Sequence, residues 1–179
     1  MSFTIYNETN APEAARQELT SSRENFGWIP NLHGVMAQAP SVLTAYKTLH
    51  ALFLQTSFNA QEKTVVWQTI NVVNGCHYCV PAHSAIADMM KVEQSLVAQL
   101  INNDTLTDPK LEVLRSTTKA IVTSQGKLSQ QQLNRFFQAG YTNQQLLEIL
   151  LGVAQKTLSN YTNHFADTPL DDQFIPYAK

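Results

Sequence analysis

Along almost the whole chain, apolar residues recur every three or four positions, which is the spacing of one face of a helix. No stretch shows the sustained period-two alternation, rich in Val, Ile and Tyr, that a strand would need. The pattern therefore predicts an all-α fold with an extended tail after Pro169. The expected helices span 12–24, 40–53, 60–73, 78–90, 96–101, 109–126, 130–139 and 143–165.

Helix start and stop signals support this division of the chain. Three capping boxes, in which a polar N-cap is followed three residues later by Glu or Gln, are Asn59/Glu62, Ser129/Gln132 and Thr142/Gln145. Asn74-Gly75 is a typical C-terminal stop. Pro81 is tolerated in a helix only within the first turn, so the following helix is predicted to begin near Tyr78.

Length and charge limit the classes of function. The 179 residues suit a single domain over 1–179, and 44% hydrophobic residues suffice for a core. A net charge of −2 without basic runs argues against nucleic-acid binding and against a polybasic membrane patch. We find neither a membrane-spanning stretch nor a secretory signal and expect a cytoplasmic protein. Charged residues are only 15%, which suits an oligomer because interfaces are depleted of charge.

The segment that carries chemistry is Asn74-Gly75-Cys76-His77-Tyr78-Cys79-Val80-Pro81-Ala82-His83-Ser84. It places Cys76 just before a predicted helix and Cys79 in the first turn, where unpaired N–H groups and the helix dipole favour thiolates. His83 follows Cys79 by four residues and shares its helix face, so its imidazole is a candidate base for the thiol. Apolar neighbours predict a small, mostly apolar pocket.

Other interpretations of the pair are open. The two cysteines could be inert core residues. With one His they supply only three zinc ligands, so His77 or His50 would have to complete a structural site. A c-type haem needs His directly after the second cysteine, where Val80 stands.

The spacing Cys76-x-x-Cys79-x-x-x-His83 resembles the signature of alkylhydroperoxidase D-like (AhpD-like) proteins in the carboxymuconolactone decarboxylase superfamily. Softer similarities lie in Ile29-Pro30-Asn31-Leu32, in Ala139-Gly140-Tyr141, and in Asn160-Tyr161-Thr162-Asn163-His164 with Pro169-Leu170-Asp171. The resemblance covers about residues 24–175.

The resemblance implies a helical bundle assembled as a trimer or hexamer, and an enzyme that reduces hydroperoxides with a dithiol donor such as a lipoyl group. It implies no bound metal or organic cofactor. Carried over, Cys79 is the peroxidatic cysteine, Cys76 resolves its sulfenic acid to a disulfide, and His83 is the base of a proton relay. Antioxidant defence is the expected setting, and the decarboxylase activity is not expected because that branch lacks the cysteine pair.

One departure from the family pattern concerns the relay. The family usually has a Glu twelve residues before the first cysteine, where this chain has Thr64. Gln68, Glu148 and Glu62 are the candidates to take its place, although Glu62 is already explained as a helix cap. The missing acid also keeps a second hypothesis open, namely a low-turnover redox-sensing or thiol–disulfide exchange module.

Overall fold

The computed structural model describes residues 3–178 and is all-helical, as predicted; no strand occurs within that range. Every predicted helix is present, and the three capping boxes form with both of their hydrogen bonds. The helices of the described chain are α1 Glu13–Phe26, α2 Asn31–Met36, α3 Pro40–Leu54, α4 Ala60–Val73, α5 Cys79–Met89, α6 Gln94–Asn102, α7 Pro109–Thr123, α8 Gln130–Gln138 and α9 Asn143–Ala166, followed by a 3₁₀ turn, Ile175–Tyr177.

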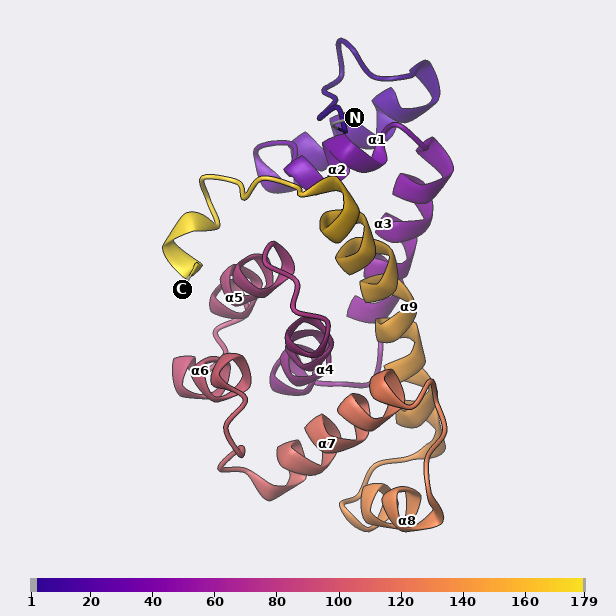
Figure 1. Ribbon diagram of the computed structural model, residues 1–179, viewed down its shortest axis with the longest axis vertical. Helices are drawn as coiled ribbons and strands as arrows, with labels where there is room; N and C mark the ends of the chain where they lie inside the picture. Colours follow the sequence, from indigo (N-terminus) through magenta and orange to yellow (C-terminus); the bar gives the residue numbers. More distant parts are fainter. Residues whose placement is uncertain (1–2, 179) are drawn as a thin grey trace.

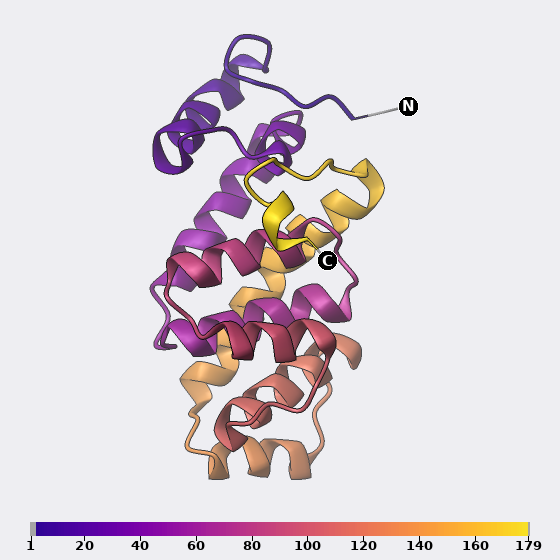
Figure 2. The same ribbon diagram turned by 90° about the vertical axis from the view of Figure 1, so that its left-hand side faces the viewer.

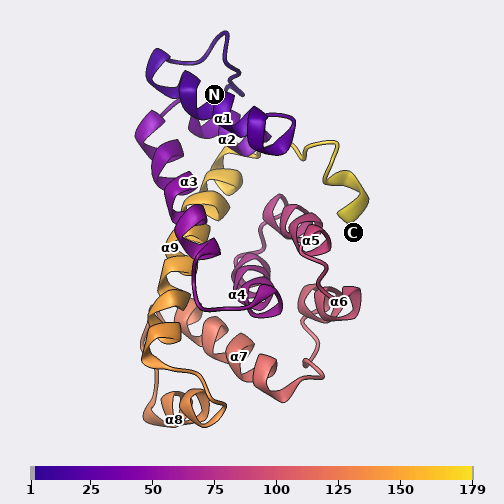
Figure 3. The same cartoon turned by 180° about the vertical axis from the view of Figure 1, so that it is seen from behind.

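The long helix α9 organises the molecule. It runs beside α3 along the long axis (Figures 1 and 3), and it also packs against α4 and α2. Helix α4 in turn contacts α5, α6 and α7, so that α4 and α9 together reach most of the other helices. The C-terminal segment crosses back from the end of α9, and its 3₁₀ turn lies against α5 (Figure 2).

Two apolar clusters form the core. One is built around the buried side chains of Phe53, Trp67 and Phe136. The other includes Leu43 and Tyr46 together with both cysteines. The cysteine motif therefore lies inside the second cluster rather than on the surface.

The turn between α4 and α5 places the motif as the sequence predicts. Helix α4 is capped by Asn74, and Gly75 takes a positive φ of 63° that favours glycine. Helix α5 then begins at Cys79, so that Pro81 lies in its first turn and its missing N–H group leaves no hydrogen bond unmade.

Two elements were not predicted. The segment after the bend at Pro30 forms the short helix α2, and the tail ends in a 3₁₀ turn instead of staying extended. Across residues 3–178 there is no helix with the length and apolar character needed to span a bilayer.

Candidate functional site

Both cysteines are free and buried, and they share a hydrogen-bond donor. The backbone N–H of Cys79 donates to Cys76 Sγ at 3.2 Å. The side-chain amide of Asn163 donates to Cys79 Sγ at 3.2 Å and lies 3.8 Å from Cys76 Sγ. The Asn163 amide of α9 thus contacts both sulfurs, and no disulfide joins them.

A buried polar face of α9 surrounds this pair. Its members are spaced by three and four residues, so they project from one side of the helix. None of them is exposed, although all carry polar groups. They are Lys156, Ser159, Asn160 and Asn163.

Lys156 is the residue of this face that sequence reasoning missed. Its Nζ lies 2.8 Å from Nε2 of His83, and it also interacts with Cys79. Burial lowers the pKa of Lys156, while the neighbouring cysteines oppose that shift. The signal in the sequence was a lysine in the middle of a long helix, followed by polar residues three, four and seven positions later.

The two thiols differ in their acidity. Burial by itself raises the pKa of Cys79, but hydrogen bonding with Cys76, the charge of Lys156 and contacts from Ser159 and Asn160 hold it well below its ordinary value. The pKa of Cys76 is raised, by its hydrogen bond to Cys79 and by burial. These surroundings therefore favour the thiolate form at Cys79 and the neutral thiol form at Cys76.

His83 shares the α5 face with Cys79, yet its ring contacts Lys156 instead of sulfur. Among the described residues no hydrogen bond joins it directly to either cysteine. Burial, then the charge of Lys156 and the neighbouring His50, hold the pKa of His83 well below 6.5, which favours the neutral ring. Its other nitrogen, Nδ1, is buried without a hydrogen-bond partner.

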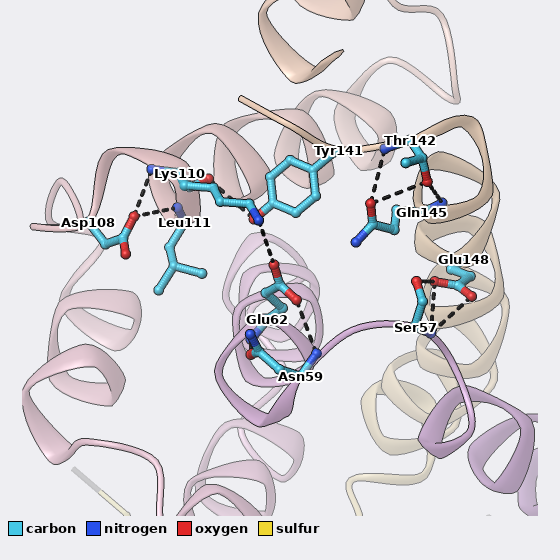
Figure 4. A network of polar contacts seen from close by, with 10 residues as sticks. All are labelled: Ser57, Asn59, Glu62, Asp108, Lys110, Leu111, Tyr141, Thr142, Gln145 and Glu148. Atoms are coloured by element: carbon cyan, nitrogen blue, oxygen red, sulfur yellow. Dashed lines mark hydrogen bonds and ion pairs between the residues drawn. The ribbon is translucent and has the colours of Figure 1, made fainter. Parts of the chain in front are cut away.

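The carboxylates considered for the relay lie elsewhere (Figure 4). Glu62 accepts a hydrogen bond from the backbone N–H of Asn59 and pairs with Lys110 at the start of α4. The motif follows the other end of that helix, about 16 Å away by helix rise. Glu148 accepts hydrogen bonds from the backbone and hydroxyl of Ser57, two turns before Lys156.

Gln68 is close to the motif but does not reach the histidine ring. Its amide donates to the carbonyl of Val80 and to the hydroxyl of Ser84, both at 3.0 Å. Gln68 therefore holds the start of α5 in place. None of the three candidates, Gln68, Glu62 and Glu148, hydrogen-bonds His83 in the described structure. Lys156 is the residue whose side chain does so.

A cavity of about 400 Å³ opens onto Cys79, His83 and Lys156. Its walls are mainly apolar and aromatic and come from α1, α2, α3, α5, α9 and the C-terminal segment. They include Phe26, Leu32, Tyr46, Ala51, Leu54, Tyr78, Ala82, Ile86 and Phe174. The apolar character agrees with the sequence, whereas a lining by His33 and His50 from α2 and α3 was not foreseen.

Residues 3–178 contain no group of three or more His, Cys, Asp or Glu side chains arranged to hold a metal ion. His50, considered as a fourth zinc ligand, instead pairs its Nδ1 with Gln155 at 3.0 Å. His77, the other, is exposed and bonds the carbonyl of Thr168. The arrangement places a cysteine of lowered pKa, Cys79, next to a second cysteine. The buried Lys156–His83 pair lies beside them, and an apolar cavity opens onto the site.

No family model and no curated protein matches this sequence. Solved structures do match over nearly their full length. The alkylhydroperoxidase AhpD core of an uncharacterized peroxidase-related protein from Ralstonia eutropha JMP134 is 18% identical, with a TM-score of 0.84 over 97% of this chain and 95% of that one. The debrominase Bmp8 in complex with 2,3,4-tribromopyrrole is also 18% identical (TM-score 0.82, 99% and 95%).

A third match is an uncharacterized peroxidase-related protein from Silicibacter sp. TM1040, at 14% identity and a TM-score of 0.80 over 97% of this chain and 95% of that one. Identities this low establish the architecture and not the reaction. The chain has the AhpD-like fold.

Proposed function

We propose that this protein is a thiol-dependent peroxidase that reduces organic hydroperoxides through Cys79 and Cys76. The observation that carries the proposal is the position of the Cys79 sulfur, which accepts a hydrogen bond from Asn163, has its pKa lowered by the charge of Lys156, and lines an apolar cavity. A thiolate is the reactive form of cysteine, and the cavity has room for an organic group attached to the peroxide.

The reaction proceeds in two steps. The Cys79 thiolate attacks the terminal oxygen of the hydroperoxide, the O–O bond breaks, and Cys79 becomes a sulfenic acid while the alkoxide leaves as an alcohol after taking a proton. The Cys76 thiol then attacks the sulfenic sulfur, water leaves, and a Cys76–Cys79 disulfide forms. An external dithiol such as a lipoyl group reduces this disulfide and is itself oxidised to a cyclic disulfide.

The test is peroxide consumption with dihydrolipoamide as the reductant, repeated on single cysteine variants. Cys79→Ser should abolish turnover because no nucleophile remains. Cys76→Ser should undergo one oxidation and stop at a sulfenic acid or mixed disulfide, which intact mass reveals. The chain has only two cysteines, so each mass change is assigned without ambiguity. Turnover that survives in Cys79→Ser would eliminate this mechanism.

A second candidate is reductive dehalogenation of a small aromatic ring. The observation that favours it is the size and apolar lining of the cavity, together with the similarity to a debrominase. In that reaction two thiols reduce a carbon–halogen bond to carbon–hydrogen, releasing halide and a proton and leaving the Cys76–Cys79 disulfide. Bromide release from a brominated pyrrole, measured beside peroxide consumption with the same dithiol, decides between the two substrates.

The low-turnover alternative, a redox-sensing or thiol–disulfide exchange module, makes a different prediction for chemistry at Cys79. A sensor needs an oxidisable pair but no fast catalytic cycle. Many dihydrolipoamide-dependent turnovers per chain therefore support the enzyme, and a single stoichiometric oxidation followed by very slow reduction supports the module.

A further inference from the structure

The Lys156–His83 contact fixes which ring nitrogen of the histidine carries hydrogen. With Cys79 ionised, Lys156 is the cation that balances it, and an ammonium group offers donors only. His83 Nε2 lies 2.8 Å from Lys156 Nζ, and beside an ammonium group this nitrogen accepts the hydrogen bond. The neutral ring then carries its proton on Nδ1.

This Nδ1–H group has no partner within the protein. The His83 side chain is buried, it lines the cavity, and its Nδ1 makes no hydrogen bond among the described residues. Buried N–H groups are nearly always paired, so Nδ1–H is the hydrogen-bond donor of this cavity-lining residue that the described protein leaves unused.

From this geometry we propose that Lys156 supplies the proton that the departing group takes up, and that His83 passes it on. The inference rests on the proposed function. As the Cys79 thiolate bonds to the outer peroxide oxygen and the O–O bond breaks, His83 Nδ1–H protonates the leaving alkoxide. His83 Nε2 takes a proton from Lys156 at the same time, so the products are a sulfenic acid, an alcohol, a neutral imidazole and a neutral amine.

Charge balance in the buried site supports this direction of transfer. Before the reaction, the site holds one thiolate and one ammonium group. The reaction removes the negative charge from sulfur, and a buried Lys156 cation without its counter-charge would be strongly disfavoured. Transfer of the Lys156 proton to the leaving group removes both charges together. His83 is thus a general acid in this step and not a base toward Cys79.

The other titratable groups of the cavity have partners of their own. His33 bonds Ser22, Tyr78 donates to Asp171, and Tyr46 bonds Gln155. The cavity lining contains no carboxylic acid, and its other lysine, Lys47, is paired with the carboxylate of Glu18 at 2.7 Å. The remaining titratable groups around Lys156 are Cys76 with a raised pKa, His50 with a pKa lowered to about 4, and Tyr46 with a raised pKa. His50 is neutral, and its Nδ1 is already paired with Gln155.

The test compares two oxidants whose leaving groups differ in basicity. tert-Butyl hydroperoxide releases a strongly basic alkoxide that needs a proton, whereas peracetic acid releases acetate, which leaves without one. Single-turnover rates of Cys79 oxidation are measured for both with the full chain. A variant that only lowers the thiolate fraction of Cys79 slows both reactions by the same factor. A change in the ratio of the two rates therefore reports a change in proton transfer to the leaving group.

We expect His83→Phe to retain most of the rate with peracetic acid, because Lys156 still stabilises the thiolate. Its rate with tert-butyl hydroperoxide should fall roughly 100-fold, the usual size of a general-acid contribution. Lys156→Met should lower both rates, and the rate with the hydroperoxide by about 100-fold more. Lys47→Met is the matched control from the same cavity and should leave the ratio of rates unchanged.

Equal losses with both oxidants in His83→Phe and Lys156→Met would overturn the relay while leaving the peroxidase intact. Wild-type protein that reacts with neither oxidant would overturn the proposed function and the relay with it. Circular dichroism of each variant shows whether it is folded. If Lys156→Met does not fold, the comparison of the two oxidants in His83→Phe is the test.

Discussion

At the scale of single residues, the acidity of Cys79 comes from its hydrogen bond with Cys76 and from groups on α9, a helix distant in sequence. The sequence alone predicts a thiolate favoured by the N-terminus of its own helix, with backbone N–H groups directed at both sulfurs. In the structure the N–H of Cys79 donates to Cys76 Sγ, and Cys79 Sγ receives its side-chain donor from Asn163 of α9. The thiolate therefore depends on how α9 packs against α5.

Asn163→Ala tests this dependence. Removing a hydrogen bond to a charged group costs about 1.5–3 kcal/mol, which corresponds to a rise of about 1–2 units in the pKa of Cys79. The pH dependence of alkylation of Cys79 in a Cys76→Ser background measures this change as a midpoint displaced to higher pH. Thr157→Ala is the control, because the Thr157 hydroxyl bonds only the carbonyl of Val153 in its own helix. An unchanged midpoint in Asn163→Ala would refute the role of the Asn163 amide.

At the scale of elements, the local sequence predicts the helices far better than it predicts which residues meet at the site. The capping boxes and the Asn74-Gly75 stop are short-range signals, and they predicted α4, α5, α8 and α9 closely. The pairing of Lys156 with His83 spans 73 residues and depends on tertiary packing, which no local pattern contains. The same limit explains why Glu62 and Glu148 remained candidates until their neighbours were known.

Glu62→Gln distinguishes a cap from a relay. A glutamine oxygen still accepts the Asn59 N–H bond of the capping box, so peroxide turnover should be unchanged. The exposed partner Lys110 adds little, and the free energy of unfolding should change by less than about 1 kcal/mol. Asn59→Ala, which removes the cap itself, should cost about 1 kcal/mol and also leave turnover intact. A tenfold loss of turnover in Glu62→Gln alone would restore Glu62 as a relay residue.

Gly152 sets how closely α9 approaches α3 and α4. A Cβ atom there would lie 2.8 Å from Phe53 Cε2 and 3.0 Å from Val66 Cγ1, both on buried side chains. Helix propensity alone predicts that Gly152→Ala stabilises α9 by about 1 kcal/mol. Overpacking costs about 1–3 kcal/mol, so we expect a net loss of about 1 kcal/mol in denaturant unfolding.

The exposed position Ala154 supplies the control in the same helix. Ala154→Gly has no packing component and should cost about 1 kcal/mol through propensity. If Gly152→Ala instead increased the free energy of unfolding, the packing of α9 against α3 and α4 would have room for a methyl group at this position.

At the scale of the whole molecule, the cavity is an assembly of segments far apart in the chain. His33 comes from α2, His50 from α3 and His83 from α5, while Lys156 comes from α9. Spacing along the chain could not reveal that three imidazoles line one cavity. Only a fold that brings α2, α3, α5 and α9 together creates a site from these residues.

The same assembly predicts that stability falls on acidification. Burial lowers the pKa of His33 to about 3 and that of His50 to about 4, from an unfolded value of 6.5. Below 6.5 the unfolded chain binds protons that the folded chain does not, so the stabilisation present above 6.5 is lost as the pH falls toward 4. Each imidazole should contribute a slope of about 1.4 kcal/mol per pH unit in denaturant unfolding. His33→Asn should reduce the slope by about 1.4 kcal/mol per pH unit. An unchanged slope in this variant would show that burial does not lower the pKa of His33.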